Sequence, residues 1–372
     1  MNPAPAFAVL SLFAGMLSTD PPAAAPVPAP SALPSRSPSL VEPPADSDMS
    51  KALKRMIVKE ERYSQEVAAM VAAFPTYGPI AAPLDCKLHI VGSDTMAPML
   101  SSAGISFQRI YPKCGVNIDQ GGTSKGIAGL KAGTCDIASM ARIVTDKELA
   151  EIAAATGKQA FAVSVGLDAI CVYVNADNPL HSVSREQCNG LFSMTHSLVK
   201  EPILRWSDLD AASPLGAVLP DLYVTGQDSG TMQSFIAWCM PGEQFTTIGR
   251  TTEHGPSAVV NACCAYREAI GIAGYVNRQP RARMVPIDLG GGRPPVAPTT
   301  ATIRDGSYPM TRPLNMVFVA PDREHIPAGI REFLRYLLSE DGQDMVAEIG
   351  MVPADASRMT DILGKPIDDI WQ

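Results

Sequence analysis

The sequence predicts an α/β fold, in which strands alternate with helices that cross over a sheet. From about Asp85 onward, short apolar runs alternate with segments whose apolar residues recur at helical spacing. Three of these runs end in glycine and small hydroxyl residues, and a helical pattern begins there. The β-branched run 161–175 is longer than most strands and is suited to crossing between two lobes.

Composition and charge limit the classes of function. The chain has 372 residues, enough for two or three domains, and its 46% hydrophobic and 18% charged residues are typical of a globular protein. The net charge is −8, and no basic stripe is present to contact nucleic-acid phosphates. We therefore expect no nucleic-acid partner, and any bound anion has to be held by local dipoles and one or two cations.

The first 76 residues divide into three segments by composition. Residues 1–19 contain an apolar run of signal-peptide length at 6–17, although no Lys or Arg precedes it. This predicts export to the periplasm or the medium; the alternatives are an apolar N-terminus without a targeting role or a wrongly assigned start codon. The Pro- and Ala-rich stretch 20–46 predicts an extended tether, and 47–76 predicts an amphipathic helix that packs on the main body or binds a partner.

The eight cysteines are compatible with disulfides in an exported chain. No C-x-x-C motif occurs, which argues against a zinc ribbon or a thioredoxin-like site. Cys135, Cys171 and Cys239 lie within apolar runs and are expected in the core. Cys86 and Cys114 are better candidates for a disulfide, although the spacing does not reveal the pairing.

The three junctions between an apolar run and a helical pattern share one design. They are Gly92-Ser93-Asp94-Thr95, Gly121-Gly122-Thr123-Ser124 and Asp228-Ser229-Gly230-Thr231, after the apolar runs 87–91, 116–118 and 222–224. A helix start leaves backbone N–H groups unpaired and carries the positive end of the macrodipole, so it attracts anions. One such turn is ordinary N-capping. Three in one chain suggest an oxyanion held where helix ends converge.

The C-terminal third of the chain predicts a further strand and two helices. The run 314–320 reads as the strand, and 330–338 and 341–349 read as the helices. Gly350 is well placed to end the second helix. The three glycines at 290–292 precede two prolines and indicate a flexible surface loop.

Motifs of known enzymes are absent from the sequence. The serine of Gly226-Gln227-Asp228-Ser229-Gly230 stands one place too late for a G-x-S-x-G elbow. The five histidines form neither H-x-x-x-H nor H-x-x-E-H, and no Walker A loop or dinucleotide fingerprint occurs. A Ser–His–Asp site assembled in space is the remaining catalytic alternative. We therefore expect no enzymatic activity, no metal and no cofactor.

Seven stretches follow one another in an order shared with a known family. They are GSDTMAP at 92–98, GTSKG at 122–126, CDIASMAR at 135–142, LDAI at 167–170, DSGT at 228–231, IGIAGYV at 270–276 and DGSYPMTRPL at 305–314. On these stretches, the chain from about Cys86 to Ala354 resembles the periplasmic phosphate-binding proteins of bacterial ABC importers, the PstS-like proteins. Each stretch alone is a weak signal, and their common order makes the resemblance strong.

The resemblance implies a two-lobed periplasmic-binding-protein fold of type II, a Venus flytrap hinged by crossing strands. Lobe 1 would comprise 86–175 plus 313–372, and lobe 2 would comprise 176–312. In relatives, phosphate is held by backbone N–H and hydroxyl groups at helix starts. Carried over residue by residue, the ligand-binding residues are Thr95, Met96 through its backbone, Thr123, Ser124, Ser229, Gly230 and Thr231.

The chain departs from the family pattern at the charged groups of this site. Many relatives have an arginine a few residues before the Ser-Gly-Thr, where this chain offers only Thr225 and Gln227. Many also have a carboxylate where this chain has Ala141. Other relatives have an arginine at the position of Arg142, which is therefore the predicted main cation. Lys125, beside a helix start, is the second candidate.

Each of these positively charged residues also has a plain structural interpretation. Arg142 could form a surface salt bridge to Glu148 or Asp146, and Lys125 could be a solvated surface residue. Asp168 matches a family position near the crossing strand, and we interpret it as structural, in a turn that bonds the backbone.

The resemblance implies an exported, monomeric solute-binding protein that captures phosphate or a similar oxyanion. It would deliver this ligand to an ABC permease in the inner membrane. The alternative is a domain of the same type that has been repurposed as a sensor, adhesin or scaffold with weak or no anion binding.

Overall fold

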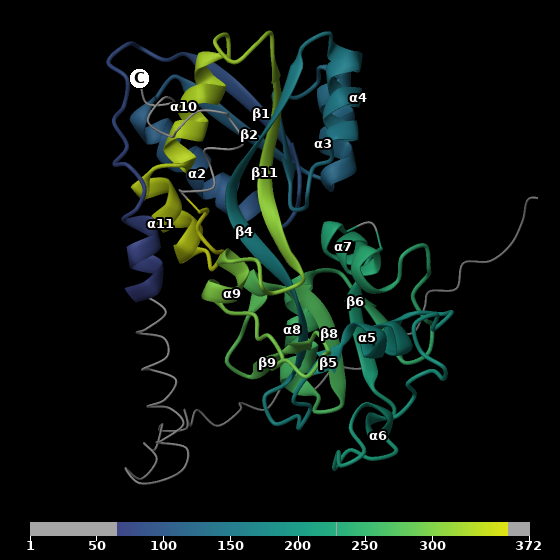
Figure 1. The fold of residues 1–372 in the computed structure, drawn as a ribbon. Coiled ribbons are helices and arrows are strands. Elements are labelled where there is room, and N and C mark those ends of the chain that lie inside the picture. Colours follow the sequence, from purple (N-terminus) through teal and green to yellow (C-terminus); the bar gives the residue numbers. More distant parts are fainter. Residues whose placement is uncertain (1–64, 228, 356–372) are drawn as a thin grey trace, which may run out of the picture. The chain divides into compact units, whose positions relative to one another are not determined.

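The strand–helix alternation predicted from residue 85 onward is present in the computed structural model, which describes residues 65–227 and 229–355. The elements are labelled in Figure 1. In the first part of the chain they are β1 (Cys86–Gly92), α2 (Ala97–Ile110), β2 (Cys114–Gln120), α3 (Thr123–Ala132), β3 (Ile137–Met140), α4 (Asp146–Thr156) and β4 (Gln159–Asn175).

The second part of the chain continues the alternation with shorter strands. Its elements are β5 (Val183–Ser184), α5 (Arg185–Phe192), α6 (Trp206–Leu209), β6 (Asp221–Thr225), α7 (Gly230–Cys239), β7 (Arg250–Glu253), α8 (Pro256–Ala265), β8 (Ala269–Gly274), the 3₁₀ turn η1 (Tyr275–Asn277), β9 (Ala282–Val285) and β10 (Ile287–Asp288). The last elements are α9 (Thr300–Arg304), β11 (Thr311–Ala320), α10 (Ala328–Leu337) and α11 (Glu340–Glu348).

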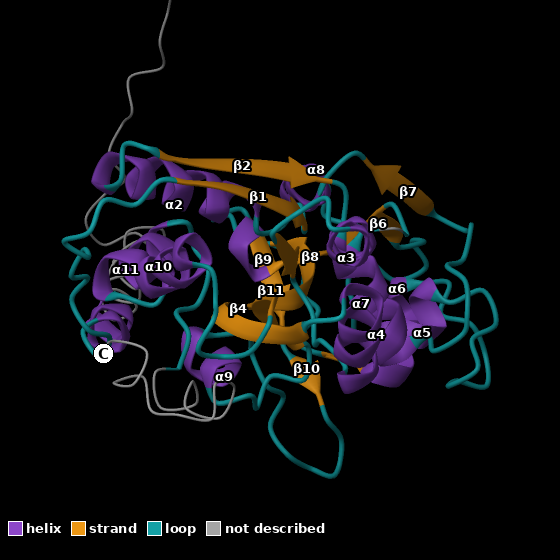
Figure 2. Ribbon diagram, turned by 90° about the horizontal axis from the view of Figure 1, so that it is seen from above, coloured by secondary structure: helices purple, strands orange, loops and turns teal. Residues whose placement is uncertain are grey.

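The main sheet has the strand order β2-β1-β3-β11-β4-β8-β6-β7, and β9 also pairs with β4. Strand β1 is parallel to β2 and β3, β6 is parallel to β7 and β8, and β11 runs antiparallel to both β3 and β4. Helices α2 and α10 contact one another and the strands β1 and β2, while α3 and α4 lie together on the other side (Figure 2). The prediction of an α/β fold is confirmed.

Strand β4 connects two hydrophobic cores. Its first half pairs with β11 over Gln159 to Ala169, and its second half pairs with β8 and β9 over Ile170 to Asn175. Figure 1 shows β4 and β11 running side by side between the two groups of strands. The predicted crossing strand 161–175 is therefore present. Since Ala169 to Val174 already belong to the second core, the core changes along β4 before residue 175; the predicted lobe boundaries remain a prediction.

The N-terminal predictions fall largely outside the described residues. This holds for the signal segment 1–19, the tether 20–46 and most of the helix 47–76, of which residues 65–71 are helical. Met70 and Phe74 are buried in the two cores, and the amide of Glu340 donates to the carbonyl of Pro75 at 2.9 Å. The described end of this segment thus packs on the main body.

Several local predictions about the C-terminal elements are confirmed. The helices α10 and α11 match the predicted ranges within two residues, and Gly350 follows α11 with a φ of 95°. The glycines at 290–292 all have positive φ and lie exposed in a turn. Within the described parts of the chain, we find no helix that is both long and apolar enough to cross a membrane.

Candidate functional site

The centre of the site is a buried ion pair between the two crossing strands. Asp168 of β4 and Arg312 of β11 are direct cross-strand partners, and their side chains are 0% and 3% exposed. The guanidinium donates from Nη2 to Asp168 Oδ2 at 2.7 Å and from Nε to the same oxygen at 3.1 Å. Asp168 Oδ1 accepts from the Val276 amide at 3.4 Å. A Cβ at position 274 would lie 3.0 Å from Asp168 Oδ2, so Gly274 leaves space for the carboxylate.

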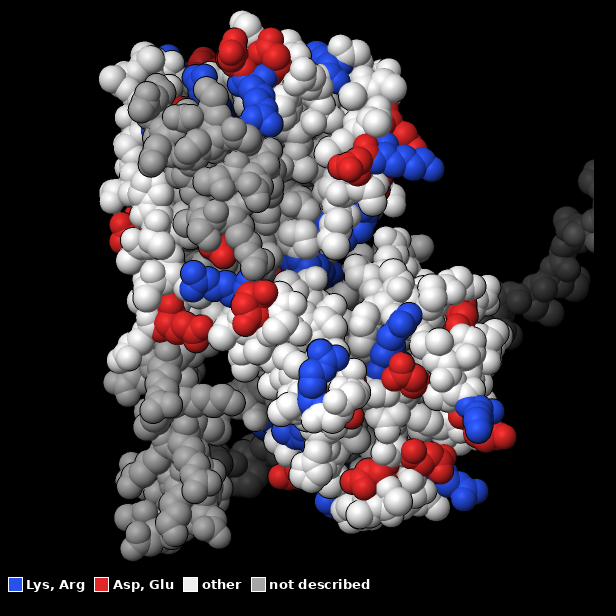
Figure 3. All heavy atoms as spheres, in the orientation of Figure 1, with Lys and Arg blue, Asp and Glu red and all other residues white. Residues whose placement is uncertain are grey.

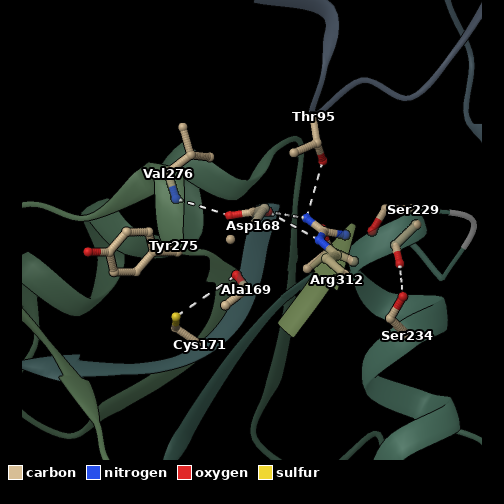
Figure 4. Close-up of polar contacts among 12 residues, drawn as sticks. Thr95, Asp168, Ala169, Cys171, Ser229, Ser234, Tyr275, Val276 and Arg312 are labelled. Atoms are coloured by element: carbon tan, nitrogen blue, oxygen red, sulfur yellow. Dashed lines mark hydrogen bonds and ion pairs between the residues drawn. The ribbon is translucent and has the colours of Figure 1, made fainter. Parts of the chain in front are cut away.

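Arg312 also reaches two helix starts. Its Nη2 donates to Thr95 Oγ1 at 3.4 Å, just before α2, and to Thr231 Oγ1 at 3.1 Å, in the first turn of α7. Figure 4 shows Arg312 between Asp168 on one side and Ser229 on the other, with Thr95 above it. Because a guanidinium only donates, both threonine hydroxyls act as acceptors here. Among the described residues, no acceptor is present for the hydrogens of these two hydroxyls.

The third helix start lies beside the start of α7. Thr123, the first residue of α3, is buried, and a Cβ on Gly230 would stand 3.8 Å from Thr123 Oγ1. The first backbone N–H groups of α3 and α7 have no acceptor within their own helices. The fold therefore brings Thr95, Thr123, Gly230 and Thr231 close together, although they come from three separate segments of the chain.

The other predicted helix-start residues have local roles in the structure. The Met96 amide donates to the Ser93 carbonyl at 3.1 Å. Ser229 is the N-cap of α7, where its Oγ accepts from the backbone and lies 2.9 Å from Thr225 Oγ1. Ser124 is exposed at the surface of α3. Their part in ligand binding remains a prediction.

Arg142, predicted as the main cation, pairs with a carboxylate in this structure. Its guanidinium donates to both oxygens of Glu148, from Nη1 at 3.0 Å and from Nη2 at 2.5 Å, and to the Ile143 carbonyl at 2.8 Å. The hydrogen bonds from Arg142 lower the pKa of Glu148 to about 2. Lys125 donates to the Gln120 carbonyl at 3.0 Å and is exposed. The salt bridge considered as the alternative for Arg142 is therefore formed.

Arg312 was not among the predicted site residues, and Asp168 was predicted to lie in a turn. Asp168 lies inside β4 and not in a turn, because its carboxylate pairs with a guanidinium on the next strand. The available signal was a charged residue within the apolar run 161–175 and another just before the run 314–320, which predicts a partner for each. Because the two residues are 144 positions apart, the sequence does not show that they are partners.

A pocket opens beside Arg312. It has a volume of about 290 Å³ and is lined by the start of the segment after β3, by the exposed face of α7 and by the beginning of β11, namely Arg142, Ile143, Ile170, Gln233, Ser234, Ala237, Trp238, Pro309, Met310, Thr311 and Arg312. This volume exceeds the share of several water molecules, at about 30 Å³ each. Two arginines thus flank a space large enough for a hydrated or substituted anion.

The charges on one face of the protein are dispersed. On the face shown in Figure 3, acidic and basic side chains are interspersed, without a large area of one sign. Within 65–227 and 229–355, no group of three or more His, Cys, Asp or Glu side chains is arranged to hold a metal ion. Besides the Asp168 carboxylate, which is paired with Arg312, the site offers hydroxyl, amide and guanidinium groups, and these suit an anion.

A family model described as a PBP superfamily domain matches residues 66–341. The phosphate-binding protein PstS of Pseudomonas aeruginosa is 27% identical over 292 residues, which cover 78% of this chain and 90% of that protein. Protein SphX of Synechococcus elongatus is 25% identical, covering 72% of this chain and 78% of that protein.

Solved structures resemble the fold over a similar span. A possible phosphate-binding protein from Planctomyces limnophilus superposes with a TM-score of 0.59 at 22% identity, covering 78% of this chain and 100% of its own. An ABC-type phosphate transport receptor from Vibrio cholerae has a TM-score of 0.58 at 20% identity, covering 71% and 99%. At these identities the likeness concerns the fold.

Proposed function

This chain belongs to the PBP superfamily as a PstS-like member, and from this premise we propose that it is a solute-binding protein for phosphate or a similar oxyanion. The ligand would lie where the starts of α2, α3 and α7 meet, next to Arg312. The protein would act by binding and release and not as an enzyme, because its relative in Pseudomonas aeruginosa is named as a phosphate-binding protein.

The orientation of two hydroxyl groups carries the proposal. Thr95 and Thr231 accept from the same guanidinium nitrogen, so the hydrogen of each hydroxyl is left for another acceptor. An oxyanion such as hydrogen phosphate offers several acceptor oxygens for these two hydrogens. Hydrogen bonds to a charged partner contribute about 1.5–3 kcal/mol each, which makes two oriented hydroxyls a substantial part of the affinity.

Further contacts are proposed from the remaining predicted residues. Thr123 and the backbone N–H groups of Ser124 and Gly230 would meet other oxygens of the ligand at helix starts. Met96 would contribute only if its amide left the Ser93 carbonyl, and Ser229 would mainly hold the first turn of α7. Arg142 would approach from the edge of the pocket as a second cation.

The cellular role is proposed from the relatives and from the predicted N-terminal segments. The protein would be exported to the periplasm or secreted as a monomer, close lobe 1 (86–175 plus 313–372) on lobe 2 (176–312) around the ligand, and dock on an ABC permease. One relative, at 27% identity, is named as a phosphate-binding protein, which supports the ligand proposed for this role.

A second candidate function is a repurposed domain that serves as a sensor, adhesin or scaffold. The observation that favours it is the bidentate pairing of Arg142 with Glu148, which neutralises the predicted cation. Calorimetric titration of the purified protein with phosphate, sulfate, arsenate and molybdate separates the two. Micromolar binding of phosphate supports the transport role. If none of the four anions binds, the transport role is overturned in favour of the repurposed domain.

A further inference from the structure

Among the described residues, nothing accepts a hydrogen bond from Nη1 of the Arg312 guanidinium. Nε and Nη2 supply the bonds to Asp168, Thr95 and Thr231, while Nη1 is buried and makes no hydrogen bond within the described parts of the chain. An arginine has five N–H groups, two of them on Nη1. Buried charged donors are almost always paired, because leaving one unpaired forfeits its hydration without replacement. We therefore expect a ligand to accept hydrogen bonds from Nη1 of Arg312.

We infer that Arg312 is the principal cation of the site and that it contacts the bound oxyanion through Nη1. The inference rests on the proposed function and deepens it. Arg312 would take the role predicted for Arg142, whose two terminal nitrogens already bond Glu148. A planar guanidinium suits phosphate-like groups, and both N–H groups of Nη1 can donate to the bound oxyanion.

Asp168 explains how such a cation can be buried before a ligand arrives. Its carboxylate balances the charge of Arg312 and fixes the guanidinium plane through two hydrogen bonds from Nε and Nη2. Both residues lie on paired strands, so their backbones are held by the ladder. The edge that carries Nη1 is thereby presented in a fixed direction, which lowers the cost of ordering on binding.

The position of Arg312 also links the ligand to both sides of the site. Through Nη2 it bonds Thr95, which precedes α2, and Thr231, which belongs to α7. Figure 4 shows the bonds to Thr95 and Asp168 converging on the one guanidinium. A ligand on Nη1 would share this guanidinium with both hydroxyls and would meet donors from both helix starts at once.

A purely structural role for the pair is the competing explanation, and the experiment separates the two. We would measure phosphate affinity by calorimetry and thermal unfolding for the full-length protein and three variants: Arg312→Lys, the double variant Asp168→Asn/Arg312→Gln, and Glu332→Gln/Arg335→Gln. The last is a matched control, because Glu332 and Arg335 form another largely buried pair with a 2.7 Å contact, on α10.

Direct contact predicts that Arg312→Lys weakens phosphate binding about tenfold or more, because lysine keeps the charge but lacks the rigid guanidinium plane that presents Nη1. The folded double variant should lose binding about 100-fold or more, while the Glu332/Arg335 control should bind within twofold of the parent. If the parent binds phosphate and both Arg312 variants bind equally well, the inference is overturned and the proposed function stands. If the parent binds no oxyanion at all, the proposed function itself has failed.

Discussion

Asp168 and Arg312 oppose each other directly in the β4–β11 ladder and form a buried ion pair with a 2.7 Å contact. The pair lies between two sheet halves and touches two helix starts, so it combines a structural and a binding position. A buried pair does not itself guarantee high stability, because both charges lose their hydration. Removal of only one partner leaves the other charge buried without a counter-ion, which is strongly destabilising.

Replacing Asp168 by leucine should destabilise the protein strongly. The Arg312 charge would remain buried without a counter-ion, which costs about 3–5 kcal/mol in the free energy of unfolding. Denaturant unfolding followed by circular dichroism measures this. As a control, Lys131→Met breaks the exposed pair with Glu151 and should cost less than about 1 kcal/mol. A loss below that size for Asp168→Leu would contradict the burial argument.

Removing the hydroxyl of Thr231 should weaken anion binding without unfolding the protein. Thr231→Ala deletes one donor to the ligand, for an expected loss of about tenfold in phosphate affinity. Thr231→Ser keeps the hydroxyl and should restore most of it. The exposed Thr252 on β7 supplies the control, since Thr252→Ala should bind as the parent does. Equal affinities for all three variants would place the ligand elsewhere.

Arg142→Ala should weaken phosphate binding less than Arg312→Lys does. Arg142 lines the pocket, but its charge is shared with Glu148. The Glu148→Gln variant is a second test. It removes the negative charge that pairs with Arg142, so the phosphate affinity should stay unchanged or rise. Calorimetry at low and high salt compares them. A larger loss for Arg142→Ala than for Arg312→Lys would return the main role to Arg142.

The Arg142–Glu148 pair should make the free energy of unfolding depend on pH. Hydrogen bonds from Arg142 lower the pKa of Glu148 from 4.5 to about 2 in the folded protein. The contribution is therefore fully present above pH 4.5 and is lost as the pH falls toward 2, an effect of about 1–2 kcal/mol for a partly exposed pair. Urea unfolding across this range should show a steeper fall for the parent than for Glu148→Gln. Parallel curves would exclude the effect.

Cys86 and Cys114 should form a disulfide once the protein is in an oxidising compartment. They are direct partners at the starts of β1 and β2, where the spacing of paired strands suits a disulfide, and both are free thiols in the structure. Exchange with an oxidising disulfide would take both thiol hydrogens and two electrons. Non-reducing peptide mapping should find the pair linked, with Cys86→Ser as the control. Two free thiols after export would refute this.

Local patterns predicted most of the elements and the region of the site. The three junctions, the crossing strand and the stop at Gly350 each depend on neighbours within a few residues, such as a cap, an apolar period or a positive φ. The helix starts with Thr95, Thr123 and Thr231 were found this way, because their unpaired N–H groups are a property of the local chain.

The choice of cation was decided by the tertiary structure. Arg142 and Glu148 are six residues apart, and both the pair and the binding role were compatible with the sequence. Arg312 and Asp168 are 144 residues apart, so no local pattern could pair them. The sequence alone determined the helix starts that attract an anion, through short-range hydrogen bonding. Only the register of β4 against β11 decided which guanidinium stands among them, because that contact exists only when distant strands pair.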